Sequence, residues 1–195
     1  MRQFSLFTVS LSSLFLLLIP HETPSTVTAL YPDLTNTTCK QCAEKSTAFN
    51  YDFCTSSLQA IPVSHVTNLQ GLALIAMELT LENATNTISN IEKMIGAGEF
   101  DPFALGCLKD CLELYGEGVS MLVDSIQVFW WEQYDAANLL LRTVLETAAT
   151  CEEGFKEKAG EVSPLSVENY DLYQLAAIAL CITDLLSPAL DSDSS

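Results

Sequence analysis

Cysteine is the residue type whose chemistry stands out first in this sequence. Seven cysteines occur in 195 residues, and an odd number leaves at least one thiol without a partner inside the chain. Two of them, Cys107 and Cys111, are four residues apart and would share one face of a helix, as metal ligands can. Only two histidines, His21 and His65, are present to complete such a site. We therefore expect disulfides or core packing here, and no metal.

The groups that could perform acid–base catalysis are His65 and many carboxylates. His65 follows Pro62-Val63-Ser64 near the predicted start of a helix, where an imidazole more often caps a helix than abstracts a proton. Most carboxylates fall between apolar positions, as the solvated face of a helix requires. No phosphate-binding loop or nucleophile elbow is present. The sequence predicts a protein that is not an enzyme, with no catalytic residues and no cofactor.

The adjacent pair Trp130-Trp131 is the most unusual aromatic feature. Two neighbouring indoles at the end of a helix cannot both point into one core, so at least one is expected at the surface. Packing against a loop and contact with a partner remain equally good explanations. In contrast, Tyr115, Tyr134 and Phe155 fall on apolar stripes and are expected in the core.

The first residues are typical of a secretory signal peptide. Arg2 precedes an apolar run that Pro20 ends, and a small, polar stretch follows. We assign residues 1–28 to the signal and predict a soluble, secreted, disulfide-bonded protein. Two sequons, at Asn36 and Asn83, fit the same route as glycosylation sites. The net charge of −17 makes nucleic acid an unlikely partner.

Four stretches carry apolar residues in steps of three and four, the spacing of an amphipathic helix. The first begins at Leu69 and ends at Gly96-Ala97-Gly98, and the second follows Asp101-Pro102, a good N-cap and first-turn pair. The third runs over residues 134–155, and the fourth follows the turn at Ser163-Pro164. Long helices joined by short connections pack best as antiparallel neighbours, which predicts an up-down-up-down four-helix bundle.

We expect one domain, at residues 29–190, because about 165 residues form one core. Residues 30–62 precede the bundle of residues 63–190, and there Cys39 and Cys54 bracket a short, weakly helical segment with a turn-like Asn50-Tyr51-Asp52. This pattern predicts a small stapled hairpin. Residues 191–195 form a short polar tail.

Several segments together resemble the plant invertase and pectin methylesterase inhibitor family. They include Asn50 to Cys54, Leu69 to Leu72, Asp110 to Tyr115, Thr150 to Phe155 and Ser163-Pro164-Leu165, in the order that the family shows. The match extends over nearly the whole chain after the signal. It is strongest to a branch named for invertase inhibition that includes a plane-tree pollen allergen.

The resemblance implies an all-α four-helix bundle with an N-terminal helical hairpin and two disulfides. These correspond here to Cys39 with Cys54 and Cys111 with Cys151. The second pair would close a loop of about 40 residues, worth roughly 4 kcal/mol in the loop-entropy model. Three further cysteines, Cys42, Cys107 and Cys181, depart from the four-cysteine pattern. Each of them either takes part in a further disulfide or is a free thiol. We expect Cys181 to be the free one, since it lies within an apolar stretch.

The resemblance also implies a secreted inhibitor that forms an equimolar complex with a cell-wall enzyme and covers its active-site cleft. Invertase inhibitors of this family often carry Pro-Lys-Phe where this chain has Glu132-Gln133-Tyr134, so pectin methylesterase and invertase remain open as targets. By position alone, the partner contacts are Trp130, Trp131, Gln133 and Tyr134. The alternative is a secreted storage, ligand-carrying or allergen-like bundle without an enzyme target.

Overall fold

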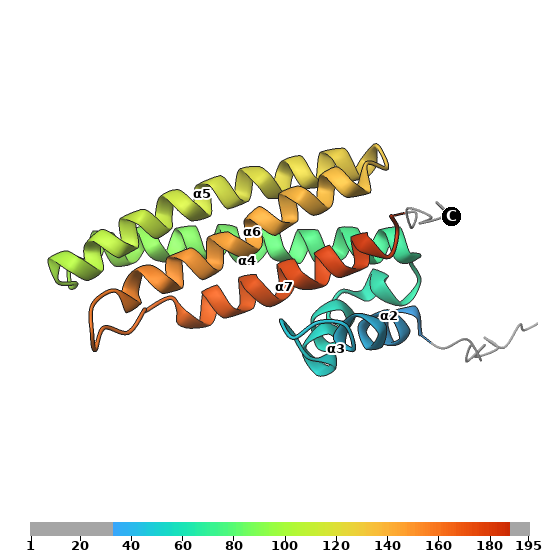
Figure 1. The fold of residues 1–195 in the computed structure, drawn as a ribbon, viewed down its shortest axis with the longest axis horizontal. Coiled ribbons are helices and arrows are strands. Elements are labelled where there is room, and N and C mark those ends of the chain that lie inside the picture. The colour runs from blue at the N-terminus through green and yellow to red at the C-terminus, as the bar shows by residue number, and fades with distance from the viewer. Residues whose placement is uncertain (1–32, 188–195) are drawn as a thin grey trace, which may run out of the picture. The chain divides into compact units, whose positions relative to one another are not determined.

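The computed structural model describes residues 33–187, and every regular element in that range is helical. The two short helices α2 and α3 are followed by the 3-10 helix η1 and then by four long helices (Figure 1). Their bounds are α2 Leu34–Ala43, α3 Tyr51–Gln59, η1 Pro62–His65, α4 Leu69–Ala97, α5 Pro102–Trp130, α6 Tyr134–Lys156 and α7 Ser166–Asp184. The predicted signal, residues 1–28, and the polar tail, residues 191–195, lie outside the described residues.

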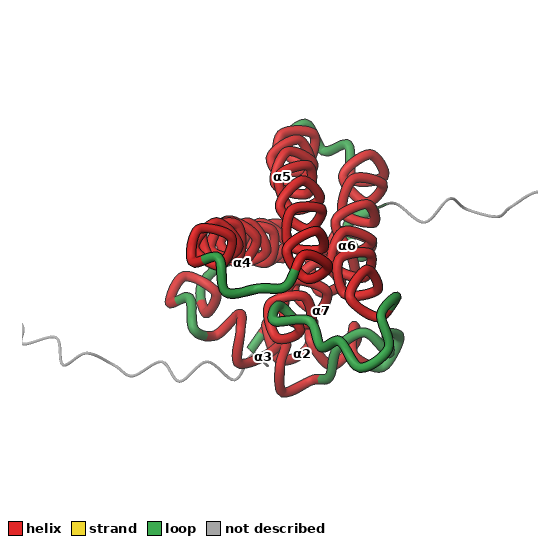
Figure 2. Tube along the Cα trace, turned by 90° about the vertical axis from the view of Figure 1, so that its left-hand side faces the viewer, coloured by secondary structure: helices red, strands yellow, loops and turns green. Residues whose placement is uncertain are grey.

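The four long helices form the predicted up-down-up-down bundle. Each packs against two others, in the cyclic order α4, α5, α6, α7, and the end-on view in Figure 2 shows them side by side. None of the helices in residues 33–187 combines the length and the apolar character that crossing a membrane demands. The fold class predicted from the apolar spacing is therefore confirmed.

The helix ends follow from local chemistry that the sequence displays. The carboxylate of Asp101 accepts hydrogen bonds from the backbone N–H groups of Phe103 and Ala104, and so caps α5. Asn68 caps α4 in the same way, through the N–H of Gly71. At its other end, α4 stops at Gly98, whose φ of 67° is left-handed and is reached without strain only by glycine.

The core lies along the inward stripes of the four long helices. Tyr115, Leu122 and Phe129 of α5 are buried, as are Val144 and Phe155 of α6. Tyr134, also expected in the core, is only half-buried. Inside the bundle the Tyr115 hydroxyl donates to Asn169 Oδ1 at 2.8 Å, and burial raises the pKa of Tyr115. The apolar stripes thus fix which face of each helix turns inward.

A partly buried contact joins α7 to α6 through a single carboxylate. Glu152 of α6 accepts a hydrogen bond from Asn169 Nδ2 at 2.8 Å and another from the Ser166 hydroxyl at 2.9 Å. Ser166 and Asn169 are in the first turn of α7, which has no side-chain cap. Glu152 therefore sets where α7 begins relative to α6.

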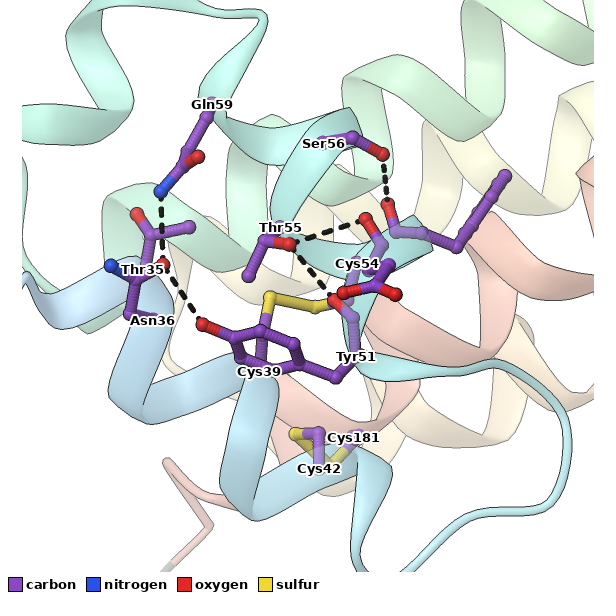
Figure 3. Close-up of a disulfide and its surroundings, with 12 residues drawn as sticks. Thr35, Asn36, Cys39, Cys42, Tyr51, Cys54, Thr55, Ser56, Gln59 and Cys181 are labelled. Atoms are coloured by element: carbon purple, nitrogen blue, oxygen red, sulfur yellow. Dashed lines mark hydrogen bonds between the residues drawn. A yellow bond between two sulfur atoms is a disulfide. The ribbon is translucent and has the colours of Figure 1, made fainter.

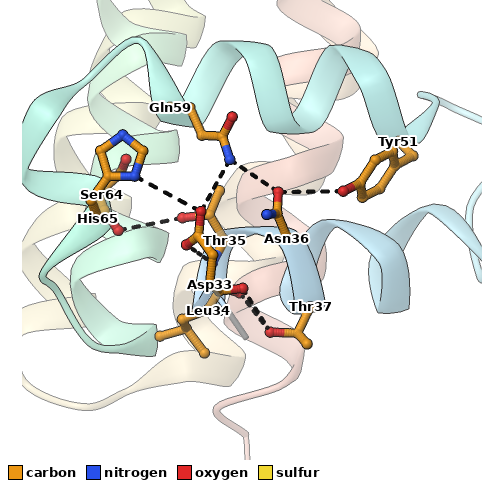
Figure 4. Close-up of polar contacts among 9 residues, drawn as sticks. All are labelled: Asp33, Leu34, Thr35, Asn36, Thr37, Tyr51, Gln59, Ser64 and His65. Atoms are coloured by element: carbon orange, nitrogen blue, oxygen red, sulfur yellow. Dashed lines mark hydrogen bonds and ion pairs between the residues drawn. The ribbon is translucent and has the colours of Figure 1, made fainter. Parts of the chain in front are cut away.

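The predicted hairpin consists of α2 and α3, which are held together by polar contacts (Figure 4). The amide of Gln59 donates to Asp33 Oδ2 at 3.1 Å and to Asn36 Oδ1 at 3.0 Å. The Tyr51 hydroxyl donates to the same Asn36 oxygen, so the first predicted sequon residue is part of the hairpin's own network. His65 Nδ1 lies 3.8 Å from a carboxylate oxygen of Asp33, the residue that caps α2.

Three disulfides cross-link the described residues. Cys39 pairs with Cys54 inside the hairpin and Cys111 pairs with Cys151 between α5 and α6, the two pairs that the family resemblance implies. The third disulfide joins Cys42 of α2 to Cys181 of α7 (Figure 3). It closes a sequence separation of 139 residues and ties the hairpin to the bundle.

The expectation that Cys181 is the free thiol is wrong, because Cys107 is free instead. Cys181 is half-buried on the side of α7 that meets α2, whereas Ile178 and Ile182 point into the bundle. The apolar residues around Cys181 therefore reflect the packing of α7 against a second element, the hairpin. Cys107 is on the buried face of α5, where its thiol donates to Gly154 O at 3.6 Å and burial raises its pKa.

Candidate functional site

The connection between α5 and α6 is a tight, ordered corner, defined here as residues 130–134. The backbone N–H of Glu132 donates to Phe129 O at 2.9 Å, and that of Gln133 donates to Val128 O at 3.0 Å. These two bonds form a Schellman motif, in which one residue adopts the left-handed conformation. That residue is Glu132, with φ 58°, the one described non-glycine residue with positive φ.

Both tryptophans of the corner are displayed to solvent. Trp130 is 69% exposed and Trp131 is 77% exposed, so neither packs into the core or under a loop. Val123, two turns earlier on α5, is also exposed. Indoles offer a large apolar surface with few rotatable bonds, and they are enriched among the residues that dominate protein–protein binding. The corner therefore has the composition of a contact surface.

Tyr134 fixes the other side of the corner to the bundle. Its hydroxyl accepts a hydrogen bond from Gln70 Nε2 of α4 at 2.8 Å, and its ring meets the Phe129 ring edge-on at 5.2 Å. Gln133, the residue before it, is exposed. A shallow cleft of about 370 Å³ runs beside them and is lined by Glu132, Gln133, Tyr134, Asp135, Ala136 and Ser187.

The surroundings of the corner are acidic. Glu132 and Asp135 line the cleft, and Asp135 accepts a hydrogen bond from the Ser187 hydroxyl at 2.9 Å. Asp184 is close by at the end of α7, and burial raises its pKa, an effect that Asp135 reinforces. A partner surface that carries positive charge would complement this end of the bundle.

The structure brings together the four residues predicted as partner contacts, since Trp130, Trp131, Gln133 and Tyr134 all form the corner. It adds Gln70 and Ser187, which come from α4 and from the end of α7. The sequence does not show that either residue belongs to the corner, because each reaches it only through the folding of the bundle.

Cys111 is in a disulfide, and within residues 33–187 no three His, Cys, Asp or Glu side chains gather as metal ligands would. The remaining sequon residue, Asn83 of α4, has a buried side-chain oxygen with no hydrogen-bond partner.

Comparison with known proteins agrees with this geometry. Residues 33–182 match the family described as Plant invertase/pectin methylesterase inhibitor, which covers more than half of the chain. The chain belongs to this family. Its members are inhibitors of enzymes and not enzymes, which agrees with the prediction from the residues.

Curated relatives cover most of the chain. A protein of Platanus acerifolia named "Putative invertase inhibitor" is 40% identical over 154 residues, which are 79% of this chain and 86% of the relative. Arabidopsis thaliana "Cell wall / vacuolar inhibitor of fructosidase 2" is 28% identical over 177 residues, 90% of this chain and 98% of the relative. Inhibitors named for either enzyme class are thus similar to this family member, as Pectinesterase inhibitor 28 of rice is, at 28% identity.

A solved structure shares the fold. The crystal structure of a mutant form of a pectin methylesterase inhibitor from Arabidopsis matches with a TM-score of 0.67 and 23% identity. The match covers 76% of this chain and 97% of that one. This likeness supports the all-helical architecture of the family member described here.

Proposed function

We propose that this chain is a secreted protein inhibitor of a plant cell-wall carbohydrate-active enzyme, either a pectin methylesterase or an acid invertase. Family membership supports inhibition, and the relatives with names for both targets support this pair of candidates. In this proposal residues 1–28 are removed on export and residues 29–190 form the inhibitor domain, with the hairpin at 30–62 and the bundle at 63–190. The product acts in the cell wall.

The observation that supports this contact surface with the enzyme is the exposed pair Trp130 and Trp131 on a rigid corner. We assign the corner, residues 130–134, to the cleft of the target enzyme, in an equimolar complex. A surface already held in its bound shape loses little conformational entropy on association, and here the Schellman turn and the bond from Gln70 hold it. The net charge of −17 favours an enzyme with a basic surface.

The direct experiment adds the purified protein to a pectin methylesterase and to an acid invertase, and measures residual activity. We expect one of the two to be inhibited, with an equimolar complex on size-exclusion chromatography. If neither enzyme slows at several-fold molar excess, the proposal fails for these targets.

A second experiment tests the contact surface on its own. The double variant Trp130→Ala/Trp131→Ala should weaken inhibition by at least about 30-fold, because a single central tryptophan contributes about 2 kcal/mol or more to such an interface. Val162→Ala is the matched control, since Val162 is 78% exposed in the loop at the opposite end of α6. Inhibition that survives the tryptophan replacement would move the contact elsewhere and leave the inhibitor assignment intact.

Glycosylation of Asn36 and Asn83 is also part of the proposal, with Asn36 the favoured site. Asn36 accepts hydrogen bonds through its Oδ1, and the Nδ2 atom that a glycan joins has no partner in the described residues, whereas the side-chain oxygen of Asn83 is buried. Removal of N-glycans from plant-expressed protein should lower the mass of the wild type and of Asn83→Gln. An unchanged mass shift in Asn36→Gln would contradict this preference.

A further inference from the structure

A groove of about 400 Å³ opens between the hairpin and the bundle, and its residues do not overlap the corner. Its apolar wall combines Ala48 from the hairpin with Leu145 of α6 and with Ala177 and Leu180 of α7. The disulfide between Cys42 and Cys181 lies in the same groove and joins its two sides (Figure 3). A volume of this size is that of a small-molecule site, and the disulfide holds it preformed.

Two basic side chains line this groove, in a chain that has few of them. Only seven Lys and Arg residues follow residue 28, against 24 Asp and Glu, yet Lys45 and Arg142 both line this one groove. Lys45 forms no ion pair with any carboxylate of residues 33–187. Arg142 Nη2 lies 4.0 Å from Asp184 Oδ2, a distance that leaves its other N–H groups available.

The charges at the groove do not balance. Lys45 and Arg142 contribute two positive charges and Asp184 one negative charge, so the groove carries one positive charge in excess. A groove with apolar walls and one excess positive charge is complementary to a molecule that has an apolar body and one negative charge.

We propose that the groove binds a small amphipathic monoanion, whose carboxylate or sulfonate lies between Lys45 and Arg142 and whose apolar body covers Ala48, Leu145, Ala177 and Leu180. This function is separate from enzyme inhibition and does not depend on it. Asp184 opposes the bound anion and is therefore the residue whose neutralisation improves binding.

The test compares two probes with similar aromatic bodies and different charge. Anilinonaphthalene sulfonate is an anion, and phenylnaphthylamine is its neutral counterpart; both report binding by fluorescence. We expect saturable binding of the anion to the intact disulfide-bonded protein. Lys45→Gln and Arg142→Gln should each raise its Kd about fivefold, and Asp184→Asn should lower it about threefold, because each changes the charge beside the anion.

Lys93→Gln is the matched control, since it removes one positive charge from an exposed position of α4 outside the groove. It should leave the Kd of the anionic probe unchanged, and the neutral probe should respond less than about twofold to all four variants. All four positions are exposed, and melting temperatures no lower than that of the wild type would exclude partial unfolding as the source of fluorescence. The proposal is overturned if the anion does not saturate, if Lys93→Gln weakens it as much, or if the neutral probe shows the same pattern.

Discussion

Glu132 is a residue in a conformation that suits glycine. It occupies the left-handed position of the Schellman turn at the end of α5, whereas the corresponding position at the end of α4 is Gly98. A side chain there costs about 1 to 2 kcal/mol, because Cβ crowds the following carbonyl. The chain thus carries strain at the corner that we assign to partner binding.

Glu132→Gly should therefore stabilise the protein by about 0.5 to 1 kcal/mol, once the greater freedom of glycine in the unfolded chain is included. Urea unfolding of the disulfide-bonded protein measures this change. The control is Glu117→Gly, which makes the same replacement at an exposed position inside α5 and should destabilise by about 1 kcal/mol. If both variants lost the same free energy of unfolding, the corner would not be strained.

Single residues also show where sequence reasoning reached its limit. Asp101 could be predicted as a cap because its position before a proline at the start of an apolar stripe has a local cause. The tryptophan pair predicted at least one exposed indole, and both are exposed. The partner of Cys181 could not be predicted, since a disulfide with a sequence separation of 139 depends on how the hairpin docks on α7.

At the scale of helices, Glu152 is the connection between α6 and the uncapped start of α7. Glu152→Ala should lower the free energy of unfolding by about 2 kcal/mol, because Asn169 Nδ2 loses a charged acceptor in a partly buried position. Glu153→Ala, at the exposed neighbouring position, should change it by less than about 0.5 kcal/mol. Urea unfolding of both variants decides between this role and a merely solvated carboxylate.

The disulfide that attaches the hairpin to the bundle can be tested separately from the disulfide inside the hairpin. The double variant Cys42→Ser/Cys181→Ser removes the link to α7, and the disulfide between Cys39 and Cys54 remains. We expect hydrogen exchange to become faster in α2 and α3 and to stay slow in α5 and α6, because the bundle keeps its own core. Cys107→Ser, which removes a thiol that is in no disulfide, is the control. Uniformly faster exchange across the bundle would mean that the disulfide stabilises the whole fold.

The arrangement of the four long helices was predictable because each buries one stripe, and a stripe is a property of one helix. The groove beneath Lys45 and Arg142 was not, because these residues come from the hairpin and from α6 and meet only after the hairpin docks. The corner was predictable in part. Its position follows from where α5 ends, but its hydrogen bond to Gln70 of α4 does not follow from the sequence. Both proposed sites thus lie where separate helices meet.

The whole molecule should be most stable in mildly acidic solution. Burial raises the pKa of Asp171 and of Asp184, so in the folded chain both bind protons at a higher pH than in the unfolded chain. Stability therefore increases as the pH falls from neutral through these raised values toward the ordinary 3.8. A smaller net negative charge acts in the same direction, because self-repulsion weakens.

Below that interval the balance reverses. A hydrogen bond from Lys158 lowers the pKa of Asp101, and the stability from this exposed pair is lost as the pH falls through the lowered value. Thermal unfolding from neutral pH to strongly acidic pH should show a melting temperature that rises and then falls. Asp184→Asn should flatten the rise, and Lys158→Met should flatten part of the fall. A melting temperature that decreases steadily from neutral pH would contradict the raised pKa values of Asp171 and Asp184, because the folded chain would then bind no more protons than the unfolded chain in this interval.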